Sequence, residues 1–303
     1  MISHTFHKSV PSAAEGEWIW ELKETPPFDE AIVSWNGTRP AKGAWTISVS
    51  LFQKEWSPWL PYAAWSPTGQ RTFQSETSFA KTYQDAAQPK EGGCTGIRIR
   101  IEGDLKGLKS LSACLSHLAG YRQADVPPLP AVWLRNMPLQ SQMILDHPRH
   151  RDLCSPTSTA NAINFLLGER AVDPVRFAEK SRDEQFDIFG NWILNTAEAY
   201  EQLKGAYQVH VERLSGFAAL HQLLSKGTPV VVSVKGALKG APQEYKWGHL
   251  ICVRGWDPET RRVHCVDSAF LTNEATEASY DLDDFLRGWS LRKNIAYVFT
   301  KTC

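Results

Sequence analysis

A proline-rich segment near the middle of the chain separates two stretches whose apolar residues follow different patterns. Residues 125–130 read Asp-Val-Pro-Pro-Leu-Pro, and three prolines in four positions favour extended backbone over a helix or a central strand. The chain has 303 residues, which exceeds what one hydrophobic core usually organises. We therefore expect two domains, residues 1–124 and 132–303, joined by a linker at 125–131.

The N-terminal stretch has the pattern of a β-rich domain. Short aromatic and β-branched runs alternate with turn residues, and these runs lie at residues 18–22, 31–35, 45–52, 71–77 and 96–102. The last run alternates apolar and charged residues with period two, as in a strand with one buried face. Many short strands separated by turns predict an all-β sandwich or jelly roll.

Seven of the twelve tryptophans fall in this β-rich half. Core packing accounts for most such rings. Trp56, Trp59 and Trp65 are the candidates for a different role, because their Pro-rich segment is poorly suited to a regular strand. They are candidates to stack sugar or peptide, so we consider carbohydrate or peptide contact by this domain.

The C-terminal stretch places helices first and strands afterwards. Helices are predicted at 156–167, from Asp173-Pro174 onward, at 192–203 and at 217–224, and a short one at 282–289. Strands are predicted at 229–234, 249–254, 262–266 and 295–300. This order is typical of an α+β domain.

Composition excludes several classes of partner. Lys+Arg and Asp+Glu both number 33, so a general attraction to nucleic acid is not expected. No apolar run approaches the roughly 20 residues that span a bilayer, so we expect no membrane span. The N-terminus lacks the apolar core of a signal peptide, which favours a cytoplasmic location.

The six cysteines, at 94, 114, 154, 252, 265 and 303, form no CxxC pair, so we expect mostly free thiols and no metal or cofactor. Cys154 differs from the others because it lies where the helix before Gly168 should begin. Unpaired N–H groups and the helix dipole at that position stabilise a thiolate.

His249 and Asp267 are the candidate partners of Cys154. His249 begins a predicted strand, and Asp267, 18 residues later, ends the next one. The turn-like residues 257–260 can join these strands as a hairpin, which would place the carboxylate beside the imidazole. A thiol, a base and a carboxylate that orients the base are the components of nucleophilic catalysis. Gln140 and Gln142 precede the cysteine, and either amide can serve as an oxyanion donor.

Three alternatives remain open from these residues alone. His147, His150 and Cys154, with Asp146 and Asp152 nearby, can be combined into a metal site. The thioester can be resolved by an amine, which gives an acyltransferase or transglutaminase-like enzyme. The chain can also be a non-catalytic protein that binds cell wall or carbohydrate.

Six short segments carry a resemblance to a known family. They are Met-Pro-Leu-Gln-Ser-Gln (137–142), Cys-Ser-Pro-Thr-Ser (154–158), Gly-Asn-Trp (190–192), Gly-Thr-Pro-Val-Val-Val-Ser (227–233), Gly-His (248–249) and Val-Asp-Ser (266–268). Through them residues 132–303 resemble the C39-like group of papain-fold cysteine peptidases. The resemblance implies a Cys154, His249 and Asp267 triad, with Gln142 completing the oxyanion hole and a peptide or protein as substrate.

The chain departs from the family pattern at two positions beside these residues. Ser155 stands where many relatives have Gly, and Ser268 stands where many have Pro. Neither departure removes a group needed for the chemistry. The resemblance therefore implies a papain-like α+β domain preceded by a β-domain, an arrangement that also resembles some bacterial members.

Overall fold

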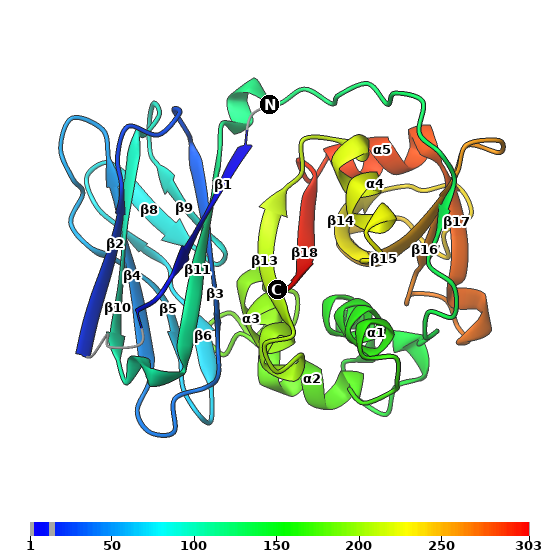
Figure 1. Ribbon diagram of the computed structural model, residues 1–303, viewed down its shortest axis with the longest axis horizontal. Helices are drawn as coiled ribbons and strands as arrows, with labels where there is room; N and C mark the ends of the chain where they lie inside the picture. Colours follow the sequence, from blue (N-terminus) through cyan, green and yellow to red (C-terminus); the bar gives the residue numbers. More distant parts are fainter. Residues whose placement is uncertain (1–2, 12–15, 303) are drawn as a thin grey trace. The chain divides into compact units, whose positions relative to one another are not determined.

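The computed structural model describes residues 3–11 and 16–302, so Cys303 lies outside the described residues. Contacts divide the chain into two compact units. One comprises the residues up to 121 together with 180–201 and 209–211, and the other comprises 122–179, 202–208 and the residues from 212 onward. The strands up to residue 116 are coloured from blue through cyan to blue-green in Figure 1.

The first unit contains two antiparallel sheets in its described part. One has the order β1-β11-β3-β9-β8-β7, and the other has the order β2-β10-β4-β5-β6. The strands of the first sheet are β1 (Ser3–Ser9), β3 (Glu30–Gly37), β7 (Ser75–Glu76), β8 (Ala80–Tyr83), β9 (Ala86–Pro89) and β11 (Leu108–Ser116). Those of the second are β2 (Gly16–Leu22), β4 (Trp45–Phe52), β5 (Leu60–Trp65), β6 (Gln70–Thr72) and β10 (Gly96–Gly103).

The two sheets of the first unit pack against each other around large rings. Trp35 of β3 meets Trp65 of β5 edge-on, with ring centroids 5.1 Å apart. The hydroxyl of Tyr62 in β5 accepts a hydrogen bond from the N–H of Val33 in β3 at 3.0 Å. On β10 the isoleucines at 97, 99 and 101 are fully buried, as the period-two alternation predicts.

The three tryptophans considered for ligand stacking have different environments. Trp65 is 1% exposed, so its assignment as a surface platform is wrong. Trp56 and Trp59 are half-buried, and the guanidinium of Arg98 lies 4.4 and 4.8 Å from their ring centroids. Arg100 also lies 4.7 Å from the ring of Trp59. These stacked cations occupy ring faces that a ligand would use, and contact with carbohydrate or peptide stays a prediction.

Helix α3 (Trp192–Gln202) groups with these sheets although it is distant in sequence. The Asp85 carboxylate accepts hydrogen bonds from the N–H groups of the first two helical residues at 2.7 and 3.2 Å. Asn191 accepts from the N–H of Leu194 at 3.1 Å, so it is the cap that its position predicts. Arg39 forms ion pairs with the buried Glu198 at 3.0 Å and with Glu201 at 3.2 Å.

The second unit contains most of a sheet with the order β13-β18-β14-β15-β16-β17 (Figure 1). Strand β12 pairs with β15 outside that order. Its strands are β12 (Val132–Trp133), β13 (Tyr207–Arg213), β14 (Val230–Gly236), β15 (Tyr245–Asp257), β16 (Arg262–Val266), β17 (Glu277–Asp281) and β18 (Ile295–Lys301). The remaining α-helices are α1 (Cys154–Leu167), α2 (Pro174–Ser181), α4 (Phe217–Ser225) and α5 (Leu282–Ser290). Short 3-10 helices occur in both units. In the first unit they are η1 (Leu105–Gly107) and η2 (Leu118–Gly120), and in the second they are η3 (Gln142–Ile144), η4 (His150–Asp152) and η5 (Glu274–Thr276).

Helix α1 lies close against the sheet because its buried residues are small. Ser158 donates a hydrogen bond to the carbonyl of Leu250 in β15 at 2.8 Å. The hydroxyls of Ser155 and Tyr297, which lies in β18, are 2.8 Å apart. The helix ends at Gly168, whose φ of 73° is the left-handed conformation that favours glycine. The start of α1 is therefore held at the middle of the sheet.

Two features of the N-terminal strands differ from the sequence expectation. The sequence predicts one strand at residues 71–77, but β6 pairs with β5 and β7 pairs with β8, so the segment crosses from one sheet to the other. Residues 60–65 form β5 despite Pro61, because that proline lies where the register with β4 shifts. Within the described residues, no helix combines the length and apolar character needed to cross a bilayer.

Candidate active site

Cys154 is the first residue of α1, as its position in the sequence predicts. The preceding residue, Leu153, provides no side-chain cap, so no cap side chain competes with the sulfur for the first-turn N–H groups. The backbone N–H groups of Ser155 and Leu250 stabilise negative charge on the sulfur. The ring of His249 is the neighbouring group that lowers the pKa of the thiol most. The helix start therefore holds the sulfur against the base.

His249 lies in β15 directly after an irregularity in the strand. Val234 of β14 pairs with His249, and Gly236 pairs with Tyr245, so residues 246–248 oppose a single residue of β14. We call residues 246–248 the β15 bulge. Gly248 has a φ of +101°, which glycine adopts more easily than any other residue. The bulge brings the Tyr245 ring onto the His249 ring, with centroids 4.1 Å apart and planes 22° from parallel.

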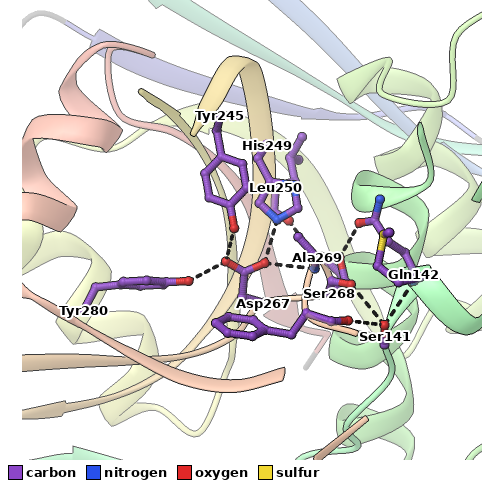
Figure 2. A network of polar contacts seen from close by, with 12 residues as sticks. Ser141, Gln142, Tyr245, His249, Leu250, Asp267, Ser268, Ala269 and Tyr280 are labelled. Atoms are coloured by element: carbon purple, nitrogen blue, oxygen red, sulfur yellow. Dashed lines mark hydrogen bonds and ion pairs between the residues drawn. The ribbon is translucent and has the colours of Figure 1, made fainter. Parts of the chain in front are cut away.

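Asp267 follows β16, in the hairpin that the turn at 257–260 predicts. Its Oδ1 lies 2.7 Å from Nε2 of His249 and accepts from the N–H of Ala269 at 3.0 Å. Its Oδ2 accepts from the hydroxyls of Tyr245 at 2.6 Å and Tyr280 at 2.5 Å, as Figure 2 shows. The carboxylate is fully buried, and the histidine is 4% exposed. Because Nε2 faces Asp267, Nδ1 is the ring nitrogen left for the sulfur.

The charges of these groups support one another. Burial opposes the charged form of His249, but the carboxylate of Asp267 and the neighbouring sulfur outweigh it and raise the pKa of His249 to about 10. Burial likewise opposes the thiolate, yet the hydrogen bond and charge of His249 hold the pKa of Cys154 below its usual range. The pKa of Asp267 is also lowered, because His249 and the two tyrosines outweigh the effect of burial. The arrangement favours a thiolate, an imidazolium and a carboxylate at neutral pH.

The other cysteines of the described chain have no comparable environment. Cys94, Cys114, Cys252 and Cys265 are buried thiols that take part in no disulfide. Burial raises the pKa of Cys94 and Cys252 to about 12 and that of Cys265 well above its usual value. Cys154 is partly exposed, so among the described cysteines it has the properties of a reactive thiol.

Gln142, and not Gln140, links the turn before Cys154 to Ser268, the residue after Asp267. Nε2 of Gln142 donates to the carbonyls of His150 and Arg151 at 3.1 and 2.8 Å, in the turn just before the nucleophile candidate. Its Oε1 accepts from the hydroxyl of Ser268 at 2.8 Å (Figure 2). The Gln140 amide instead donates to the adjacent carbonyl of residue 141 at 3.1 Å. Gln142 is therefore the amide that the fold brings to the site.

The residues considered for a metal site, which include His147, His150 and Cys154, do not form a set of metal ligands. His147 pairs with Glu179 at 3.0 Å, and Nδ1 of His150 lies 3.2 Å from the carbonyl of His147. Across residues 3–11 and 16–302, no three His, Cys, Asp or Glu side chains form a group that could hold a metal ion.

Sequence reasoning missed three groups at this site. Tyr245 lies four residues before His249, and only the β15 bulge turns that spacing into ring contact. Tyr280 belongs to β17, a strand that the sequence did not predict. Ser268 was noted as a departure from the family pattern, but its hydrogen bond to Gln142 was not foreseen. Of these three groups, only Tyr245 has a signal in the sequence, which is its position four residues before the candidate base His249.

The match to a family of known fold identifies the chain as a papain-like cysteine peptidase. The chain belongs to the Peptidase_C39 like family, whose sequence model matches residues 134–297, more than half of the chain. No curated protein matches it. Among solved structures it is similar to xylellain, a cysteine protease from Xylella fastidiosa, with 13% identity and a TM-score of 0.37 over 60% of this chain and 92% of that one. The resemblance read from the short segments is confirmed at the level of the family.

Proposed function

We propose that the chain hydrolyses a peptide or amide bond through Cys154, His249 and Asp267, with a thioester intermediate. The observation that carries this proposal is the 2.7 Å hydrogen bond between His249 and the buried Asp267, beside a Cys154 thiol whose pKa His249 lowers. A binding protein has no need of this series of contacts. Peptide or protein substrates follow from the family to which the chain belongs.

The reaction uses each group in turn. The Cys154 thiolate attacks the carbonyl carbon, and the C=O electron pair moves onto oxygen. The N–H of Cys154 stabilises this oxyanion together with Nε2 of Gln142, which turns one of its two hydrogens from the carbonyls of His150 and Arg151 to the oxyanion. Collapse of the intermediate expels the amine, which takes the proton from His249 and leaves a thioester. Water then attacks the thioester, His249 accepts its proton, and the acid and the thiolate are released.

The proposal extends to the organisation of the chain. Residues 132–303 are proposed as the peptidase domain, preceded by a β-sandwich accessory domain at 1–124 and a linker at 125–131. The packing of residues 180–201 with the N-terminal strands indicates that the accessory domain also supports α3. A location in the cytoplasm stays a prediction.

Peptide cleavage tests the proposal most simply. A peptide library incubated with the wild-type chain should yield new amino termini, and Cys154→Ala should reduce the rate by more than about 1000-fold. Cys94→Ala, which alters a buried thiol of the other unit, is the matched control and should keep its activity. Cleavage that survives in the Cys154→Ala variant would contradict the proposal.

Acyl transfer on the same site is distinguished by its products. The first half of the reaction is common to both enzymes, because each forms the Cys154 thioester. Mass spectrometry of products formed with and without an added primary amine separates them. Free acid as the product in both cases supports hydrolysis, whereas an amide that replaces most of the acid supports acyl transfer.

A further inference from the structure

The Asp267 carboxylate accepts more hydrogen bonds than the orientation of a histidine requires. Within the described residues it accepts four, two at each oxygen. Two of the donors are phenols, from Tyr245 in β15 and Tyr280 in β17, and both rings are at most 3% exposed. Figure 2 shows the two hydroxyls converging on one oxygen while the other oxygen faces His249.

We propose that Tyr245 and Tyr280 are positioning residues, which keep Asp267 ionised and oriented toward His249, and that the ring of Tyr245 also supports the protonated imidazole from its face. This inference rests on the proposed function, because it assigns roles within the same site.

Hydrogen-bond geometry gives the first reason. A carboxylate has about four acceptor positions, and the four donors observed use that capacity. Donors that bind the charged form favour it over the protonated acid, which matters most in a buried site where ionisation is otherwise costly. Because Oδ2 is held by two phenols, the carboxylate cannot rotate without breaking two hydrogen bonds. Oδ1 therefore stays directed at Nε2 of His249.

The stacked ring gives the second reason. The Tyr245 ring lies 4.1 Å from the His249 ring and nearly parallel to it. The negative face of an aromatic ring attracts a cation placed over it, so this contact favours imidazolium over neutral imidazole. One residue thus acts on Asp267 through its hydroxyl and on His249 through its ring.

The phenols themselves stay protonated over the working range. Burial and the charge of Asp267 raise the pKa of Tyr245 and of Tyr280 far above the usual value, so both remain donors. The titratable groups that face this cluster from the surrounding elements are Cys154 on α1, His249 on β15 and Cys265 on β16. The burial of Cys265 raises its pKa as well, so it stays neutral beside the carboxylate.

Phenylalanine variants separate this role from simple packing, because they keep each ring and remove one donor. We expect Tyr280→Phe and Tyr245→Phe each to raise the midpoint of the acid limb of kcat/KM by about 0.5–1 pH unit, and the double variant to raise it further. The reason is that Asp267 then takes up a proton at a higher pH, and without its charge the imidazolium and the Cys154 thiolate beside it are less stable. Tyr245→Leu should in addition lower the midpoint of the basic limb by about half a pH unit relative to Tyr245→Phe.

The matched control is Tyr62→Phe, which removes a buried phenol from the other unit. Its hydroxyl contacts the backbone of Val33 and Asp85, so the variant should lose stability without a shift in the pH profile. The acid limb can also be measured by iodoacetamide alkylation of Cys154, which requires no peptide substrate. If the wild-type thiol shows a lowered pKa but no peptide is cleaved, the proposed function fails while the alkylation profiles still test the two tyrosines. Phenylalanine variants that fold and keep the wild-type midpoints would overturn the inference.

Discussion

Removal of the Asp85 side chain should destabilise the chain through a helix distant from it in sequence. Asp85 is 7% exposed, and its carboxylate accepts from the first two N–H groups of α3 at 2.7 and 3.2 Å. An N-terminal capping acceptor contributes about 1 kcal/mol, and a partly buried negative charge at a helix N-terminus contributes up to about 2 kcal/mol. We therefore expect Asp85→Ala to lower the free energy of unfolding by roughly 2–3 kcal/mol.

Urea unfolding followed by circular dichroism measures this effect as a lower midpoint at an unchanged slope. Asp104→Ala is the control, because that carboxylate is exposed and accepts from the N–H of Lys106 at only 3.3 Å. It should change the free energy by less than about 0.5 kcal/mol. Asp85→Asn keeps an acceptor without the charge and should fall between the two. An Asp85→Ala variant as stable as Asp104→Ala would refute the argument that the N-terminal strands support α3.

Two further substitutions test the geometry around the site. Gly248→Ala places a side chain at a φ of +101° and 3.1 Å from the Arg292 guanidinium, so it should cost about 1–3 kcal/mol in urea unfolding and slow alkylation of the nucleophile by displacing His249. Unchanged stability and alkylation would show that the β15 bulge does not position the base. Ser268→Ala removes the donor to Oε1 of Gln142 and should lower kcat about tenfold while alkylation is unaffected. A kcat equal to that of the wild type would remove Ser268 from the oxyanion argument.

The predictable part of the site was encoded locally. Pro156 near its start and Gly168 at its end define α1, so the position of Cys154 at a helix start follows from its neighbours. The turn at 257–260 joins β15 and β16 directly, so pairing of the two strands brings Asp267 toward His249. The family resemblance then selects Gln142 over Gln140. In the structure Gln142 contacts both Arg151, before the candidate nucleophile, and Ser268, after Asp267.

The remaining features depend on contacts between distant segments. Tyr280 reaches Asp267 only because β17 pairs with β16, and nothing in the local sequence of β17 specifies that neighbour. The β15 bulge changes which residues face each other, and strict period-two reading cannot anticipate such a change. The packing of residues 180–201 with the N-terminal strands is likewise set by long-range partners such as Arg39 with Glu198.

The proposed mechanism depends on a Cys154 thiol that is ionised at neutral pH. Alkylation of the wild-type chain with iodoacetamide, measured across pH with the modified residue located by mass spectrometry, reports that state directly. We expect Cys154 to be labelled first, with a rate that has already risen well below pH 9, where an ordinary thiol ionises, because His249 is protonated beside it up to a pKa of about 10. A rate that rises as a single ionisation near pH 9, or first labelling at another cysteine, would contradict the account.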